Sequence, residues 1–164
     1  MLETKFLKDN IQNIQKLMAL PPLQNFETSS LRQLLRLSKI REFQHNEKII
    51  EEGATDPWLY FLLSGRARVE KDGVQIAFLE EVGELIGEMR LLDGKERSAS
   101  VLAEGKAVCL AVKTDAKDRL ASEGEKANFL LMLYRVFAEF VTLRLRLTNE
   151  ELARTKAGST KSHG

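Results

Sequence analysis

The sequence predicts an α+β fold that is mainly β, namely a double-stranded β-helix (jelly-roll) barrel flanked by N-terminal helices and a long C-terminal helix. Three observations support this prediction. Short apolar runs separated by glycine-containing turns fill the middle of the chain, which is typical of a β-sandwich or barrel. Apolar residues at helical spacing precede and follow that region. With 164 residues, 43% of them hydrophobic, the chain can bury the core of one such domain.

Two helices are expected before the barrel. Residues 2–20 carry apolar side chains on a narrow helical stripe, and Pro21 and Pro22 end it. The hydroxyl side chains at positions 28–30 can cap a second helix over Leu31–Ser38. The pattern leaves open whether the first helix packs on its own domain or extends toward a partner.

From Ile40 the apolar pattern changes to that of strands. A dense aromatic and aliphatic run is followed by alternating positions, and Lys71-Asp72-Gly73 favours a hairpin, because Asp-Gly readily adopts the positive φ of such turns. Two later strands are expected on either side of a loop over residues 104–106. The expected strands are Trp58–Leu63, Ala67–Val69, Val74–Leu79, Ser98–Ala103 and Ala107–Val112.

The last helix carries two apolar stripes. The first has the alternating spacing of four and three residues that is typical of a coiled coil, and the second runs beside it. One stripe can pack on the barrel while the other binds a second helix, which predicts a homodimer through this helix. The alternative is that the N-terminal helices of the same chain bury both. The first stripe consists of Phe129, Leu133, Val136, Phe140, Leu143 and Leu147, and the second of Leu130, Tyr134, Phe137, Val141, Leu145 and Leu152.

The residues after Leu152 are mostly small and polar, so we expect a disordered tail. They leave no room for the two helices of a helix-turn-helix, and we therefore expect no DNA-binding domain in this chain. The expected boundaries are 1–25 for the N-terminal helix, 26–124 for the barrel with the helix that leads into it, 125–153 for the dimerisation helix and 154–164 for the tail.

The charge balance and the cysteine content restrict the partners. The 25 basic and 24 acidic residues give a net charge of +1, which does not favour nucleic acid. Cys109 is the single cysteine, so we expect a buried thiol, no internal disulfide and a reducing compartment. No apolar run approaches the ~18 residues of a membrane span, and the first residues lack a signal-peptide pattern. We therefore expect a cytoplasmic location and no membrane contact.

The residues suited to binding a ligand lie between residue 83 and residue 101. Gly87 allows the backbone to approach a ligand closely, since no Cβ stands in the way. Arg97 supplies a planar, permanently charged fork for phosphate oxygens, and Ser98 can add a hydrogen bond. A phosphate repels a carboxylate, so Glu88 is better suited to a sugar hydroxyl. The combination indicates a sugar phosphate with a single negative charge.

The motif Ile86-Gly87-Glu88, followed by a short helical turn and by Glu96-Arg97-Ser98-Ala99-Ser100-Val101, resembles the phosphate-binding cassette of the cyclic-nucleotide-binding domain in the bacterial cyclic-AMP receptor protein superfamily. The resemblance covers roughly residues 26–152. It implies that Glu88 holds the ribose 2′-hydroxyl and that Arg97 and Ser98 hold the cyclic phosphate. It also places Thr148 and Asn149 where the base is contacted. The ligand-binding residues expected on this basis are Gly87, Glu88, Met89, Arg97, Ser98, Thr148 and Asn149.

Arg90 departs from the family pattern, which has a small residue at this position. Its side chain could crowd the pocket, turn to solvent or add charge to the ligand. Two site residues also have a purely structural interpretation. Arg97 could form a surface ion pair with Glu96 or Glu88, and Glu88 could be an acid that stabilises a helix start.

The resemblance implies a regulatory sensor protein in signal transduction, with cAMP as the first choice of ligand, cGMP as the second and no other cofactor. The last helix would move on binding and act on an unknown effector protein. The alternative is a nucleotide-free module that serves as an oligomerisation or docking scaffold. We do not expect an enzyme or a metal site, because His45 and His163 are the only histidines and no nucleophile pair is evident.

Overall fold

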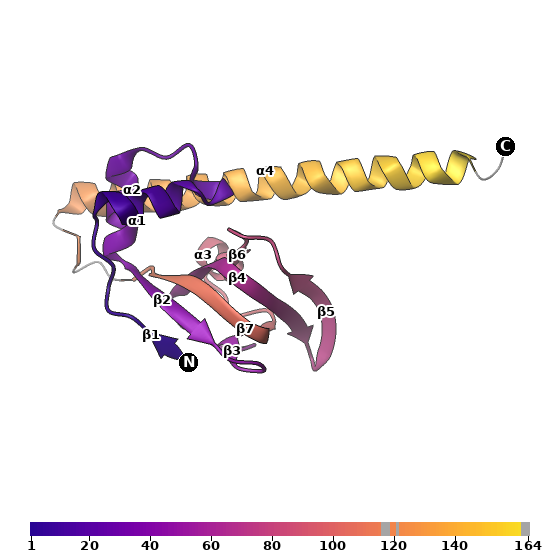
Figure 1. Ribbon diagram of the computed structural model, residues 1–164, viewed down its shortest axis with the longest axis horizontal. Coiled ribbons are helices and arrows are strands. Elements are labelled where there is room, and N and C mark those ends of the chain that lie inside the picture. The colour runs from indigo at the N-terminus through magenta and orange to yellow at the C-terminus, as the bar shows by residue number, and fades with distance from the viewer. Residues whose placement is uncertain (116–118, 121, 162–164) are drawn as a thin grey trace.

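The computed structural model describes residues 1–115, 119–120 and 122–161, and Figure 1 shows a β-barrel with its helices gathered on one side. The predicted jelly-roll class with a long C-terminal helix is confirmed. The strands are β1 (Leu2–Glu3), β2 (Ser38–Phe43), β3 (Lys48–Ile50), β4 (Trp58–Lys71), β5 (Val74–Leu79), β6 (Leu85–Ile86) and β7 (Ser100–Lys113). The helices are α1 (Ile11–Met18), the 3₁₀ turn η1 (Pro21–Leu23), α2 (Thr28–Arg36), α3 (Glu88–Asp93) and α4 (Glu123–Lys161).

All strand pairs are antiparallel, in the order β1-β2-β7-β4-β5, with β3 on β7 and β6 on β4. The long strands β4 and β7 pair from Trp58 opposite Lys113 to Glu70 opposite Ser100. Their register shifts around Ser64, next to Gly65, and such a bulge bends a strand. The predicted hairpin is confirmed, since Asp72 and Gly73 adopt φ values of 51° and 77° between β4 and β5.

Two sequence-based predictions about these strands are wrong in the same way. Residues 58–63 and 67–69 belong to one strand, β4, and residues 104–106 lie within β7 instead of forming a loop. A Cβ at Gly65 would lie only 2.1 Å from the carbonyl oxygen of Lys106, so the two strands touch backbone to backbone where they bend. Glycine interrupts the apolar pattern at these bends while backbone pairing continues, and the sequence pattern therefore suggested separate strands.

The N-terminal helix is shorter than predicted. Leu2–Glu3 forms β1 on the edge of β2, and α1 begins only after Asn10, whose side-chain oxygen accepts a hydrogen bond from the Asn13 amide at 2.9 Å. The Glu3 carboxylate also contacts Lys39 and Arg41 on β2. The free edge of β2 and these two cations hold the first residues extended. Helix α1 itself packs on its own domain through Ile14 and Leu17, which are buried.

The first part of α4 belongs to the core, and its distal part does not. Phe129, Leu133, Val136 and Phe140 are buried beside α1, α2 and η1. Beyond Phe140 the helix leaves the core, and Leu143 and Leu147 are 43% and 49% exposed. The C-terminal end of α4 projects past the barrel (Figure 1). The predicted seam is therefore divided between core and surface. In the second stripe Phe137 is buried, whereas Leu130, Tyr134, Val141, Leu145 and Leu152 are exposed. The alternative that this chain buries both stripes is wrong.

The expected disordered tail is wrong as far as Lys161, because α4 continues to that residue. Residues 154–161 contain no proline, and Thr155 donates its hydroxyl to the Glu151 carbonyl at 2.9 Å within the helix. Residues 162–164 lie outside the described part of the chain. Among the described residues, no helix is long and apolar enough to cross a membrane.

The barrel interior holds the single cysteine. Cys109 is fully buried on β7, in a cluster with Tyr60, Leu62 and Ile86. Burial raises the pKa of this thiol to about 12. A thiol that stays protonated is a poor nucleophile, so Cys109 packs as a small apolar side chain. It plays no part in the site described next.

Candidate nucleotide-binding site

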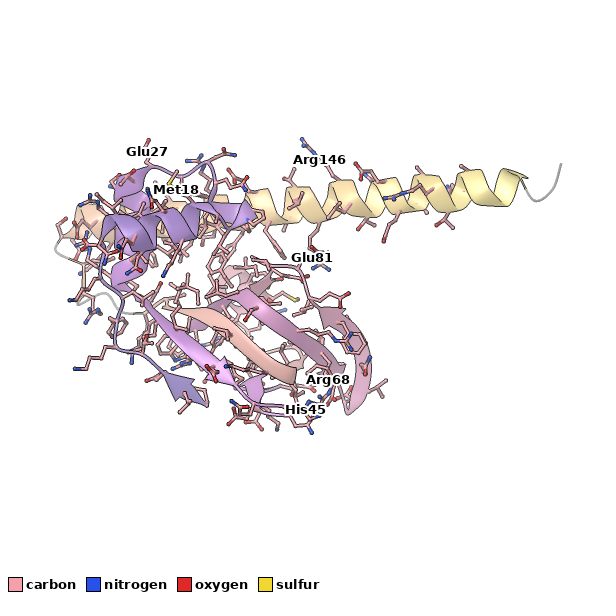
Figure 2. The ribbon with its side chains drawn as sticks, in the orientation of Figure 1. Met18, Glu27, His45, Arg68, Glu81 and Arg146 are labelled. Atoms are coloured by element: carbon pink, nitrogen blue, oxygen red, sulfur yellow. The ribbon has the colours of Figure 1, made fainter. Side chains whose placement is uncertain are left out.

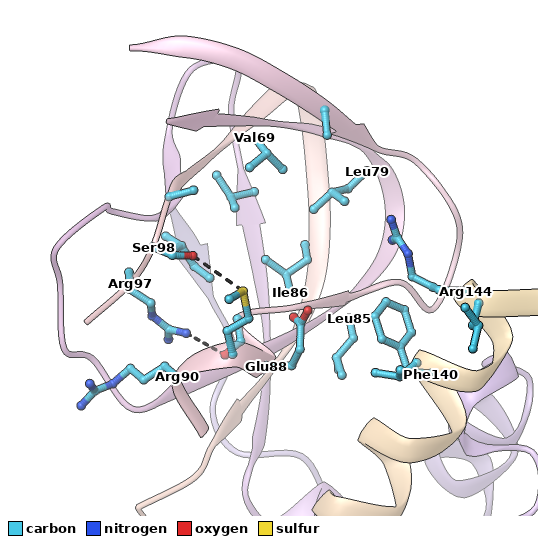
Figure 3. Close-up of a pocket in the computed structure, with 18 of the residues that line it drawn as sticks. Val69, Leu79, Leu85, Ile86, Glu88, Arg90, Arg97, Ser98, Phe140 and Arg144 are labelled. Atoms are coloured by element: carbon cyan, nitrogen blue, oxygen red, sulfur yellow. Dashed lines mark hydrogen bonds between the residues drawn. The ribbon is translucent and has the colours of Figure 1, made fainter. Parts of the chain in front are cut away.

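A pocket of about 530 Å³ opens between the barrel and α4 (Figure 3). This volume is in the range of small-molecule binding sites. The walls are mostly apolar, and the charged side chains come from α3, from the segment before β7 and from α4. The lining residues are Ile50, Val69, Ala77, Leu79, Leu85, Ile86, Gly87, Glu88, Met89, Arg90, Arg97, Ser98, Ala99, Val101, Phe140, Val141, Arg144, Leu145 and Thr148.

Gly87 forms the turn from β6 into α3 and adopts a left-handed φ of 93°. A Cβ at this position would lie 2.6 Å from Nη1 of Arg97 and 2.9 Å from Cδ1 of Ile50. Both the conformation and the space therefore require glycine. The same close approach brings the Gly87 carbonyl within 2.8 Å of Arg97 Nη1, which donates a hydrogen bond to it. This turn fixes α3 and the guanidinium relative to each other.

Arg97 is buried, with an exposed fraction of 6%, and its guanidinium is bound on several sides. Its Nη2 forms a 2.8 Å ion pair with Oδ1 of Asp56 and donates to the Trp58 carbonyl. Its Nε lies 3.3 Å from Oδ2 of Asp56. Burial alone would raise the pKa of Asp56, but the hydrogen bonds and charge of Arg97 outweigh burial and lower it. The alternative interpretation, a surface ion pair of Arg97 with Glu96 or Glu88, is therefore wrong.

Glu88 is the first residue of α3, and its carboxylate points into the pocket (Figure 3). Burial raises the pKa of Glu88, while hydrogen bonding to the backbone at Glu88 and Gly87 and the positive charge of Arg144 act in the opposite direction. Burial outweighs them, because little water reaches the carboxylate. A donor hydroxyl on a ligand would add a further hydrogen-bond partner.

Of the other predicted ligand-binding residues, all but one line the pocket. Ser98 and Met89 meet at the pocket rim, where the Ser98 hydroxyl lies 3.7 Å from the Met89 sulfur. Thr148 also lines the pocket, from α4. Asn149 is absent from the lining, because the next position on a helix points about 100° away. The structure thus brings six of the seven expected residues together and leaves Asn149 outside.

Arg90 neither crowds the pocket nor extends freely into solvent. Its guanidinium points away from the cavity (Figure 3) and donates to the carbonyls of Asp56 and Lys95, at 3.2 Å and 3.0 Å. It therefore joins α3 to the segment that carries Asp56. Both Arg90 and Arg97 converge on Asp56, which no sequence pattern indicates as a site residue. An acid 41 positions from its arginine gives no local pairing signal.

Arg144 is a second residue that the sequence analysis missed. It lies on α4 at the mouth of the pocket, and its Nη1 donates to Oε1 of Glu84. Glu84 is 8% exposed, and its other oxygen accepts hydrogen bonds from the amides of Glu80 and Glu81. This ion pair connects α4 to the segment between β5 and β6. The sequence resemblance instead indicates contacts from Thr148 and Asn149, one turn later on α4.

Comparison with known proteins agrees with this geometry. A model of the cyclic nucleotide-binding domain matches residues 40–124. A cGMP-dependent protein kinase of Eimeria tenella is 33% identical over 112 residues, which are 65% of this chain and 11% of that kinase. The chain therefore spans only a small part of this relative.

Solved structures are also similar to this chain. A cyclic nucleotide-binding domain from Methylobacillus flagellatus has a TM-score of 0.68 and 20% identity over 88% of this chain and 84% of that one. The catabolite activator protein of Thermus thermophilus has a TM-score of 0.57 and 27% identity, covering 83% of this chain and 63% of that one. The family match, with the cassette geometry of Gly87, Glu88 and Arg97, shows that this chain belongs to the cyclic nucleotide-binding domain family.

Proposed function

We propose that this chain is a regulatory sensor for a cyclic nucleotide, with cAMP as its ligand. The observation that carries the proposal is the buried Arg97 beside the Gly87 turn, with the Glu88 carboxylate in the same pocket. Nη1 of Arg97 has two hydrogens and, among the described residues, bonds only Gly87. One N–H is left for a phosphate oxygen, while Glu88 can accept the ribose hydroxyl.

The same pocket also accommodates cGMP, which is the second candidate ligand. Its support is the similarity to a kinase described as cGMP-dependent. The base would lie against the apolar wall formed by Val69, Leu79 and Val141. Thr148 and Arg144 are the polar groups that α4 presents there.

Helix α4 is the element through which ligand binding would be transmitted. It supplies one wall of the pocket through Phe140, Arg144 and Thr148, whereas the cassette belongs to the barrel. A ligand that contacts both parts favours the arrangement in which both contacts are made. The proposed output is a change in how α4 is presented to an effector protein, in a cytoplasmic, non-enzymatic role.

A thermal melt with cAMP, cGMP and linear AMP tests this proposal. A ligand at about 100 times its dissociation constant adds about 2.7 kcal/mol to the unfolding free energy, or roughly 5 to 10 °C for a domain of this size. The increase should disappear in Arg97→Ala, because removal of a buried charge partner costs about 2 to 5 kcal/mol of binding. Arg68→Ala is the matched control, since Arg68 pairs with Glu70 and Glu104 away from the pocket.

A nucleotide-free scaffold is the second candidate function. The observation in its favour is the ion pair in which Asp56 neutralises Arg97. A flat melt with all three nucleotides would support this function and refute the sensor.

We also propose a homodimer through α4, formed by the exposed residues of the second stripe that lie outside the nucleotide pocket. Tyr134 and Leu152 are 48% and 52% exposed on one face, and neither lines the nucleotide pocket. Sedimentation should show a loss of dimer in Tyr134→Ser combined with Leu152→Ser. Ile76→Ser on β5, where the side chain is 60% exposed, should leave the mass unchanged. A wild-type monomer would refute the dimer.

A further inference from the structure

A second hollow lies on the barrel side of α4, next to the nucleotide pocket. This hollow, which we call the acidic groove, has a volume of about 500 Å³. It runs between α4 and the segment over residues 78–84, which leads from β5 to β6. Its lining residues are Pro21, Pro22, Phe78, Glu80, Glu81, Val82, Gly83, Glu84, Phe140, Leu143, Arg144, Leu147, Thr148 and Glu151.

The apolar part of the acidic groove is left open to solvent. Val82 is 54% exposed on the barrel side, and Leu143 and Leu147 are 43% and 49% exposed on α4. Leu143, Leu147 and Glu151 follow one another at intervals of four residues, so they form one ridge along the helix. A second helix can place its own ridge beside this one.

The charged residues that line the acidic groove are mostly acidic. Glu80, Glu81, Glu84 and Glu151 line it against a single cation, Arg144. Arg144 is already bonded to Glu84, and Arg66 lies 3.7 Å from Glu80 just outside. Figure 2 shows Glu81 on the side of the barrel that faces α4, while Arg146 points to the opposite side of the helix. The rim therefore carries a net negative charge.

We infer that the acidic groove is the docking surface for a basic amphipathic helix of a protein partner. Leucine-type side chains of such a helix would pack on Val82, Leu143 and Leu147, and its lysine or arginine residues would face Glu81 and Glu151. Complementary charges of this kind select the partner and orient it. A second copy of this chain fits less well, because a two-fold contact would bring the same acidic rim to both sides.

The acidic groove and the nucleotide pocket share part of one wall. Phe140, Arg144 and Thr148 line both hollows from α4. A change in the position of α4 therefore alters the two sites together. This linkage rests on the proposed nucleotide binding, whereas the docking surface itself does not. If both ligands prefer different positions of α4, each changes the affinity of the other by the same factor.

The test uses fluorescence anisotropy with the whole chain and a labelled synthetic peptide. The peptide is a leucine–lysine sequence of about 14 residues with leucine at i, i+3, i+4 and i+7, which forms four helical turns. A scrambled peptide of the same composition and a leucine–glutamate peptide serve as comparisons. We expect only the amphipathic basic peptide to bind well.

Charge reversal locates the binding surface. Glu81→Lys combined with Glu151→Lys should weaken peptide binding by about tenfold or more, because attraction becomes repulsion at the rim. Glu150→Lys is the matched control, since Glu150 adjoins Glu151 but does not line the groove. Equal loss in Glu150→Lys, or equal binding of the scrambled peptide, would overturn the inference. A third outcome would also overturn it: wild type does not bind the peptide, and the groove variant differs from wild type in sedimentation mass. That outcome would indicate a contact between copies of this chain.

Measurements with added nucleotide separate this inference from the proposed function. Peptide binding is measured first without nucleotide, and then with saturating cAMP or cGMP. A changed peptide affinity supports the linkage, and an unchanged affinity with a nucleotide that shifts the melt refutes the linkage. If no nucleotide shifts the melt, the sensor proposal fails while peptide binding still decides the docking surface.

Discussion

Asp56 and Arg97 form a 2.8 Å ion pair between a segment before β4 and the segment before β7. The carboxylate holds the guanidinium in place by two of its nitrogens, so the protein's own side chains orient the arginine. It also cancels the charge that would attract a phosphate from a distance. A cyclic phosphate must therefore gain its affinity from directed hydrogen bonds at short range.

The first prediction concerns the pH dependence of stability at Asp56. Its pKa in the folded chain is lower than the ordinary value of 3.8. Its ion pair therefore stabilises the fold above that value, and the contribution is lost as the pH falls through the lower folded pKa. Asp56→Asn should reduce the melting temperature at neutral pH, and its difference from wild type should shrink below pH 3.8. A difference that stays constant as the pH falls would contradict this assignment.

The second prediction concerns Gly87. Gly87→Ala should lower the unfolding free energy by about 1 to 3 kcal/mol for the left-handed conformation, with an additional loss from the clash with Arg97. Gly94→Ala is a matched control, because Gly94 has a φ of 69° at the other end of α3 and no atom within 4 Å of an added Cβ. Chemical denaturation measures both variants. Calorimetric titration with cAMP should show a loss of affinity only for Gly87→Ala.

The third prediction concerns the role of Glu88. If its carboxylate accepts the ribose hydroxyl, wild type should bind cAMP at least about tenfold more tightly than 2′-deoxy-cAMP, since a hydrogen bond to a charged group contributes about 1.5 to 3 kcal/mol. Glu88→Gln should reduce this preference. Burial raises the pKa of Glu88. As the pH falls, the preference for cAMP over 2′-deoxy-cAMP should therefore begin to decline at a higher pH than it would with an ordinary glutamate. Equal preferences in both proteins would remove Glu88 from ribose recognition.

The fourth prediction concerns the ion pair of Arg144 with Glu84. Arg144→Ala leaves a nearly buried carboxylate without its cation, which should cost about 1 kcal/mol of stability and speed amide hydrogen exchange in α4 beyond Phe140. Arg144→Lys should restore part of the loss. Arg146→Ala tests the same helix on its opposite side (Figure 2) and should change neither quantity. Unchanged exchange in Arg144→Ala would show that this pair does not hold α4.

Much of the cassette could be predicted because its parts lie near one another along the chain. Gly87 and Glu88 stand at the start of the short helix α3, and Arg97 follows its end, and each residue type implies its own chemistry. The hairpin at Asp72 and Gly73 was predictable for the same reason. The errors at the strand bends arose because an interrupted apolar pattern looks the same whether a strand ends or bends.

The first residues show a further limit of the sequence. Phe6 and Leu7 fit a helical stripe with Ile14 and Leu17, yet Leu2–Glu3 is extended. The stripe reports apolar spacing, whereas the pairing of β1 depends on the unoccupied edge of β2, which is about 40 residues away in the sequence.

The sequence by itself determined the class of fold, with its flanking helices, and indicated candidate residues for a phosphate-binding cassette, since these depend on local conformation and on periodic burial. Only the tertiary structure decided that Asp56 neutralises Arg97, that Arg90 turns away from the pocket and that Glu84 ties down Arg144. It also decided where α4 leaves the core. The physical reason is that ion pairing and burial depend on which distant segments come into contact, and the spacing of residues along the chain does not indicate those contacts.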